Sequence, residues 1–196
     1  MKKFELTDEF ITNAFGNKLF RIKAIVDFGT IRAGELGGFV EKEENLSNDD
    51  NAWVSGNARV SDDARISDDA RISGNAQVSG NASVFGNASV SDDARISGNA
   101  QVSGNASVFG NAWVSGNADY AVVEGFGRYF RATTFFRCKD KILRVQCGCF
   151  YGDLAEFREI VKKTHGDSKY AKEYLAIADL MELHFSDDEG RQEAAE

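Results

Sequence analysis

A six-residue phrase repeats almost without interruption between residues 54 and 117. Each phrase carries Val or Ile, then Ser, then GlyAsn or AspAsp, and places Ala two residues before the next aliphatic residue. The aliphatic residues are Val54, Val60, Ile66, Ile72, Val78, Val84, Val90, Ile96, Val102, Val108 and Val114. A strict hexapeptide period is typical of a parallel β-helix. Strand residues two apart share a face, so each Ala and the following aliphatic residue should point inward. Gly, Asn and Asp tolerate left-handed backbone angles and predict corners.

This stretch resembles the hexapeptide-repeat family, whose fold is the left-handed parallel β-helix. The resemblance implies triangular coils of three phrases each, so the phrases listed above should form about four coils. More loosely, the flanking segments AlaGlyGluLeuGlyGlyPheVal (33–40) and CysGlyCysPheTyrGlyAspLeuAlaGluPhe (147–157) resemble hexapeptide proteins of bacteriophage and prophage genomes. The expected fold class is therefore mostly β, with additional elements at both ends of the β-helix.

The N-terminal part, residues 1–53, is predicted to be a β cap with an irregular first coil. Segments 4–6 and 19–26 read as strands separated by a turn at 15–18. The step from Leu46 to Val54 is longer than one phrase, which breaks the period. Repeat stacks need atypical terminal units to cover their open ends, and this segment fits that role.

Residues 120–186 are predicted to form a C-terminal α+β domain of a hairpin and two helices. Strands are expected at 120–126, 131–138 and 142–150, with a hairpin turn at 140–141 that sets Cys147 opposite Thr134. Asp153 should cap a first helix, and a second helix should start at Ser168. The apolar stripes of the two helices are Leu154, Phe157, Ile160, Val161 and Thr164, and Tyr170, Tyr174, Ile177, Met181 and Phe185. Residues 187–196 read as a charged, disordered tail.

The composition restricts the function classes. A net charge of −8 over 196 residues argues against a general binder of nucleic acids or membrane surfaces. The chain has no apolar run long enough to span a membrane and no hydrophobic signal core, so we expect a cytoplasmic protein, in the host cytoplasm if phage-encoded. Three cysteines suit reduced thiols better than a disulfide framework.

Catalysis has weak support. Enzymes of the hexapeptide-repeat family transfer acyl groups from coenzyme A or an acyl carrier, with a histidine on a looped-out segment as general base. Here no insertion interrupts residues 54–119, and the two histidines, His165 and His184, lie outside them. No catalytic residue and no cofactor are therefore predicted, and an acyltransferase is kept as an alternative. Cys138, Cys147, Cys149 and His165 could bind zinc, but CysGlyCys lacks the usual knuckle spacing, so buried free thiols and no metal are expected.

The outward positions of the repeat suggest contacts between subunits. Phe85 and Phe109 should point outward on different faces, which favours a homo-oligomer, a trimer or alternatively a dimer. Two tryptophan–arginine pairs lie three phrases apart and should stack, Trp53 with Arg71 and Trp113 with Arg95. Residues 67–88 recur unchanged at 91–112. That offset is four phrases rather than one coil, so the repeat resembles a spacer more than a flat binding ladder.

Basic and aromatic residues alternate in the C-terminal domain. The candidate binding residues are Arg128, Tyr129, Arg131, Arg137, Lys139, Lys141, Arg144 and Tyr151. Such interleaving can hold phosphate and stack a base, although strand aromatics also serve as core. We therefore expect a non-catalytic oligomeric binding protein that acts on a host component, such as a bacterial defence system. A protein partner is expected, a nucleotide or nucleic acid could bind the C-terminal domain, and a membrane partner is not expected. A structural spacer is a further alternative.

Overall fold

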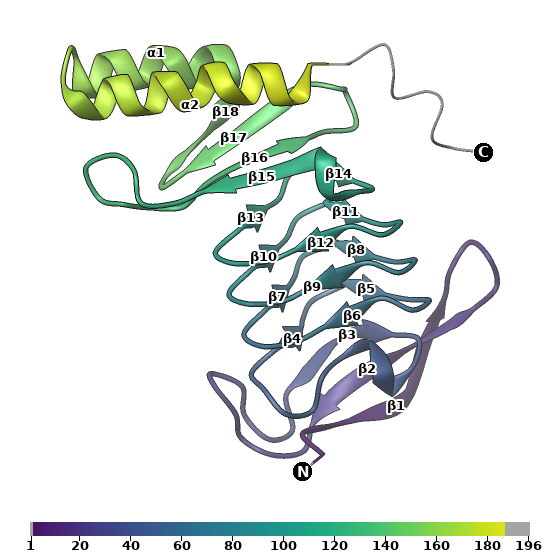
Figure 1. The fold of residues 1–196 in the computed structure, drawn as a ribbon. Coiled ribbons are helices and arrows are strands. Elements are labelled where there is room, and N and C mark those ends of the chain that lie inside the picture. Colours follow the sequence, from purple (N-terminus) through teal and green to yellow (C-terminus); the bar gives the residue numbers. More distant parts are fainter. Residues whose placement is uncertain (1, 187–196) are drawn as a thin grey trace.

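The computed structural model describes residues 2–186, and the predicted tail at 187–196 lies outside them. The chain forms a column, with N-terminal strands at one end, a β-solenoid in the middle, and a sheet with two helices at the other end (Figure 1). No helix within the described part of the chain is long and apolar enough to cross a membrane.

The solenoid is built from two-residue strands, one for each phrase. They are β4 (Trp53–Val54), β5 (Arg59–Val60), β6 (Arg65–Ile66), β7 (Arg71–Ile72), β8 (Gln77–Val78), β9 (Ser83–Val84), β10 (Ser89–Val90), β11 (Arg95–Ile96), β12 (Gln101–Val102), β13 (Ser107–Val108) and β14 (Trp113–Val114). Parallel pairing joins positions three phrases apart, such as Val60 with Val78 and Val78 with Ile96. The predicted coil of three phrases is confirmed, and about four coils stack.

The interior of the solenoid consists of the repeated Ala and aliphatic side chains, which are at most 1% exposed from Ala58 to Val114. The corners need left-handed backbone angles, with φ of 57° at Asp62 and 65° at Gly74. The corner carboxylates have a further role. Asp62 Oδ2 accepts a hydrogen bond of 2.9 Å from the amide of Gly80, one coil later, and Asp68 and Asp92 do the same for Gly86 and Gly110. The acidic corners therefore tie neighbouring coils together.

The N-terminal strands continue one wall of the solenoid. β1 (Phe4–Thr12) and β2 (Lys18–Ala24) form an antiparallel hairpin, and β3 (Leu36–Val40) pairs antiparallel with β2 and parallel with β5. A short 3-10 turn, η1 (Glu43–Asn45), follows, and Leu46 forms a parallel bridge with Ile66. The first coil is longer than those that follow, because the partners Val40 and Val60, and likewise Leu46 and Ile66, are further apart in sequence than Val54 and Ile72. The coil at this end of the solenoid therefore departs from the regular period.

The C-terminal sheet closes the other end. After η2 (Asn117–Asp119), the strands β15 (Tyr120–Val123), β16 (Thr133–Arg137), β17 (Leu143–Cys147) and β18 (Phe150–Asp153) form an antiparallel sheet in chain order. It lies between the solenoid and the two helices (Figure 1). Successive residues point to opposite faces, so Phe136 joins the solenoid core and Phe135 the core under the helices. One sheet therefore serves two cores.

The predicted hairpin register is wrong by one residue. Cys147 lies opposite Thr133, and Thr134 lies opposite Gln146. The cause is a loop at 139–141, one residue longer than predicted, in which Lys141 adopts the left-handed conformation with φ of 64°. The sequence predicted three strands in this region, over 120–126, 131–138 and 142–150, and β18 is a further strand that completes the four-stranded sheet.

Both helices begin at the predicted residues. Asp153 caps α1 (Leu154–His165), and its carboxylate accepts a 2.9 Å hydrogen bond from the amide of Glu156. Ser168 caps α2 (Lys169–Phe185). Phe157, Val161, Tyr174, Ile177, Met181 and Phe185 are buried, whereas Ile160 and Tyr170 are partly exposed. The helical stripes are therefore mainly core, as predicted.

Candidate functional site

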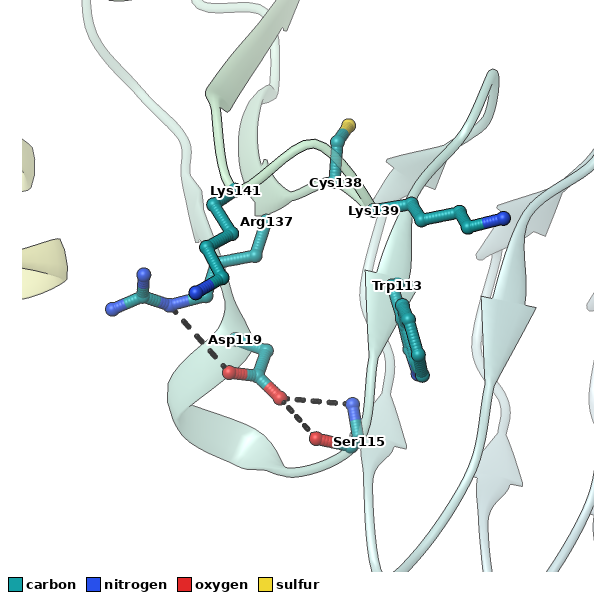
Figure 2. Close-up of a pocket in the computed structure, with 7 residues that line it drawn as sticks. All are labelled: Trp113, Ser115, Asp119, Arg137, Cys138, Lys139 and Lys141. Carbon is teal, nitrogen blue, oxygen red and sulfur yellow. Dashed lines mark hydrogen bonds and ion pairs between the residues drawn. The ribbon is translucent and has the colours of Figure 1, made fainter. Parts of the chain in front are cut away.

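A cleft of about 400 Å³ opens where the last solenoid strand meets the hairpin between β16 and β17. We call it the Trp113 cleft. Its lining residues are Trp113, Ser115, Asp119, Arg137, Cys138, Lys139 and Lys141. Figure 2 shows Trp113 on its strand below Lys139, and Arg137 and Lys141 over Asp119. Two regions distant in sequence thus supply one aromatic ring and three cations.

Trp113 occupies the outward position of the last repeat strand and is 46% exposed. It pairs in register with Arg95, as predicted from the spacing of three phrases. Trp53, the other tryptophan, occupies the same position on β4 but is 4% exposed, and its ring packs edge-to-face with that of Phe28, with centroids 5.4 Å apart. The chain therefore buries one tryptophan and leaves the other available to a ligand.

Asp119 is the acid of the cleft, and its carboxylate is already bound. It accepts hydrogen bonds from the Ser115 amide at 2.9 Å, the Ser115 hydroxyl at 2.7 Å and the Gly116 amide at 3.1 Å. Arg137 Nε lies 3.6 Å from its other oxygen. These contacts hold the turn after β14 and neutralise the carboxylate, so the cleft keeps a net positive character.

The cations of the cleft fall into two groups. The Arg137 guanidinium already forms contacts within the chain, since it pairs with Asp119 and donates a 2.8 Å hydrogen bond to the Phe185 carbonyl. Lys139 and Lys141 are exposed, and neither forms an ion pair with a carboxylate of residues 2–186. The Lys139 amide donates to the Asn111 carbonyl at 3.0 Å, which fixes the hairpin to the solenoid. The backbone is held while both ammonium groups remain open to solvent.

The cleft offers little for nucleophilic catalysis. Burial raises the pKa of the Cys138 thiol to about 11, so it is protonated at neutral pH. Neither histidine is among the lining residues, because His165 ends α1 and His184 lies near the end of α2. The lining residues are of the types that bind an anion beside an indole ring.

The predicted binding residues separate into three places. Arg137, Lys139 and Lys141 line the Trp113 cleft. Arg128, Tyr129 and Arg131 border a second cavity on the helix side of the C-terminal sheet. Arg144 pairs with Asp140 at 2.9 Å, and Tyr151 packs on Phe109 with ring centroids 4.6 Å apart. The sequence did not reveal this separation, because the loop between β15 and β16 borders the helix side of the sheet and the hairpin between β16 and β17 borders the solenoid.

Phe109 and Phe85 have different surroundings. Phe109 contacts both Tyr151 and Phe136, so the C-terminal domain of the same chain covers its ring. Phe85 is half-buried on another wall of the solenoid. Of the two predicted interface residues, Phe109 thus serves a contact within the chain.

Sequence reasoning missed Trp113, Ser115 and Asp119 as parts of the site. The available signal was a tryptophan at the outward position of the last phrase, where most other phrases carry Arg, Gln or Ser. Its neighbours could not be inferred, because they depend on the way the C-terminal hairpin folds back onto β14.

The cysteines only partly follow the expectation of buried free thiols. Cys138 is buried and Cys147 half-buried, but Cys149 is exposed, because it lies at the turn between β17 and β18. No group of three or more His, Cys, Asp or Glu side chains within residues 2–186 is arranged to hold a metal ion.

Comparison with known families matches residues 64–80, 76–92 and 100–116 to the model described as YdcK Beta solenoid repeat. The comparison with curated proteins gave no match. The matched segments lie inside the stack of β6 to β14, which the structure folds as solenoid coils. The repeat region is thus similar to the YdcK β-solenoid repeat, and this match and the four stacked coils together support the expected repeat β-helix family.

Proposed function

We propose that this protein is a non-catalytic binding protein whose Trp113 cleft takes a nucleotide, with the base on Trp113 and phosphate on the lysines. The observation that carries the proposal is that one cleft is lined by an exposed indole and by two lysines that form no ion pair with a carboxylate of residues 2–186. Among residues 2–186, Asp119 is the one acid that lines the cleft, and it is neutralised by Arg137 and backbone amides.

The free energies of the available contacts favour a ligand with both an aromatic ring and a negative charge. Stacking of a base on an aromatic side chain contributes about 1–3 kcal/mol. Exposed ion pairs contribute only about 0–1 kcal/mol each, so neither lysine suffices alone. A ligand that uses the ring and both lysines gains from each contact. The volume of about 400 Å³ is in the range of small-molecule sites.

The protein as a whole is acidic, with a net charge of −8. Long nucleic acids would be repelled by most of this surface, whereas a mononucleotide fits within the local positive field. The nucleotide is therefore favoured over the nucleic acid among the ligands expected from the sequence. A protein partner that inserts an acidic segment is the competing occupant, and binding measurements with acidic peptides distinguish it.

The wider biological role is part of the same proposal. The flanks resemble phage and prophage proteins, which favours a host component as the target. A protein that binds a nucleotide without converting it would act by sequestering it, which is one way to inhibit a nucleotide-dependent defence system. A homo-oligomer would present several such clefts and raise avidity.

Fluorescence titration tests the site directly, because Trp113 is exposed and Trp53 is buried. We expect ATP and AMP to quench the Trp113 emission saturably, ATP more tightly, and added salt to weaken both. Adenosine should bind weakly, and no nucleotide should be hydrolysed. Trp53→Phe should keep the signal. Trp113→Gln should fold normally, since Gln77 and Gln101 occupy the same position on other strands, and should lose nucleotide binding.

Charge variants of the two lysines test the phosphate contacts. Lys139→Gln with Lys141→Gln should weaken ATP binding about tenfold or more, because two phosphate contacts are lost. Arg65→Gln, an exposed cation on a solenoid wall, is the matched control and should change nothing. Failure of every phosphate compound to bind, or equal ATP binding by Trp113→Gln, would overturn the proposal. Binding of acidic peptides but not nucleotides at the same residues would favour a protein partner.

A further inference from the structure

A second cavity, of about 210 Å³, lies between the C-terminal sheet and the helices and differs chemically from the Trp113 cleft. We call it the Arg131 cavity. Its walls are mainly apolar and include the buried side chains of Phe157, Val161 and Tyr174 and the partly exposed Ile160. These residues come from α1 and α2, and the hairpin between β17 and β18 closes the opposite side.

Two arginines and a tyrosine border the cavity. They belong to the loop of residues 124–132, between β15 and β16. Both guanidinium groups contact the Tyr129 ring, that of Arg128 at 5.6 Å and that of Arg131 at 5.0 Å from its centroid. Arg131 also crosses the hairpin at Gly148, where an added Cβ would lie 2.8 Å from Arg131 Nη1. A side chain at position 148 would displace the guanidinium, so the glycine leaves room for it.

The cavity has positive charge without a counterion among the described residues. Neither Arg128 nor Arg131 forms an ion pair with any carboxylate of residues 2–186, and no Asp or Glu of this range lines the cavity. Glu173, next to Tyr174 on α2, accepts a 2.9 Å hydrogen bond from the Gly127 amide and pairs with Lys169 at 3.3 Å. The Glu173 carboxylate is therefore engaged elsewhere, and the two arginines border an apolar cavity that no acid of residues 2–186 lines.

The loop is held in a costly conformation. Phe130 has φ of 53° and is 70% exposed, although bulky residues rarely adopt left-handed angles. Such strain costs on the order of 1–3 kcal/mol and persists where surrounding structure imposes it. Gly127 anchors the loop against Tyr174, because a Cβ there would collide with the Tyr174 hydroxyl. This contact holds the loop, with Tyr129 and Arg131 beside the cavity, in its strained conformation.

We infer that the Arg131 cavity binds a small monocarboxylate with an apolar body. The carboxylate lies against Arg131 and Arg128, because a guanidinium offers paired donors that match two carboxylate oxygens. The apolar body lies against Phe157, Val161 and Ile160. The volume is below the roughly 300–1,000 Å³ of drug-sized sites, which selects a short chain or a single ring. This site stands independently of the Trp113 cleft.

Octanoate is the probe, with octan-1-ol and octylamine as neutral and cationic counterparts of the same chain. Calorimetry should show saturable octanoate binding, with octan-1-ol at least about tenfold weaker and octylamine weaker still, since a charge-assisted hydrogen bond is lost. Cys149 is exposed and lines the cavity, so octanoate should also slow its alkylation by iodoacetamide, measured on the peptide by mass spectrometry.

Arg131→Gln should weaken octanoate binding about tenfold while the unfolding midpoint stays close to wild type, because the side chain is exposed. Lys172→Gln removes an exposed charge of α2 outside the cavity and should leave binding unchanged. Trp113→Gln should also leave it unchanged, so this test is separate from that of the nucleotide site. No octanoate binding at millimolar concentration, or equal affinity for octanoate and octan-1-ol, would overturn the inference.

Discussion

Stacked corners should make some glycines of the solenoid far less replaceable than others with the same backbone angles. Gly74 and Gly104 both have left-handed conformations, with φ of 65° and 67°. A Cβ at Gly74 would lie 2.8 Å from the amide nitrogen and 3.1 Å from the Cα of Asp92, one coil later. A Cβ at Gly104 would meet only the Glu124 carboxylate, at 3.7 Å. Substitution by alanine therefore separates the cost of the corner conformation from the cost of stacking.

The conformational cost is shared by both variants. A left-handed alanine costs roughly 1–2 kcal/mol. Reduced entropy of the unfolded chain returns about 0.4–1 kcal/mol. Gly104→Ala should therefore destabilise the fold by about 1 kcal/mol. At Gly74 the coils must also separate slightly, which stretches the hydrogen bonds from Ser73 N to Val90 O (2.9 Å) and from Asn75 N to Asp92 O (2.8 Å). Overpacking of this kind adds about 1–3 kcal/mol.

Urea unfolding, followed by circular dichroism, should then rank the variants as wild type, Gly104→Ala and Gly74→Ala in decreasing stability. The last two should differ by about 1–3 kcal/mol, with similar denaturant slopes. If both substitutions cost the same free energy of unfolding, contact between stacked corners does not limit these positions, and the reasoning from coil spacing is refuted.

Three further predictions concern the C-terminal domain and the assembly. Burial raises the pKa of the Cys138 thiol from 9.0 to about 11, so its contribution to stability is complete below pH 9 and is lost as the pH rises towards 11. Thermal unfolding across this range should show that the free energy of unfolding of the wild type falls by at most about 3 kcal/mol and that of Cys138→Ala does not. An equally steep fall with pH in the variant would contradict the assignment. A double-mutant cycle of Phe109→Leu and Tyr151→Leu should give a coupling of about 0.5–1.5 kcal/mol, because the rings are 4.6 Å apart, and additive effects would show that the contact does not join the two parts. Light scattering should give a multiple of the 21.5 kDa chain, three-fold for the expected trimer, and a monomer at micromolar concentration would exclude the oligomer.

The fold of the solenoid, from β4 to β14, could be predicted from the sequence repeat alone. The hexapeptide period, with Ala and an aliphatic residue on one face, leaves few ways to bury both side chains, and it correctly predicted the stacking of Val60 on Val78. The cap at Asp153 and the start of the second helix at Ser168 could also be predicted, because the signals that begin a helix are local to a few residues.

The ends and the candidate sites were decided by tertiary structure. A longer loop with a left-handed Lys141 moved the β16–β17 register by one residue, which sequence spacing does not reveal. The same fold brings Lys139 to Trp113 and sends Arg131 to the opposite side of the sheet. Repeats are determined by short-range periodicity, whereas a cleft between distant segments depends on how the sheet docks on the solenoid. That docking is governed by non-local packing, such as the contact of Phe109 with Phe136 and Tyr151.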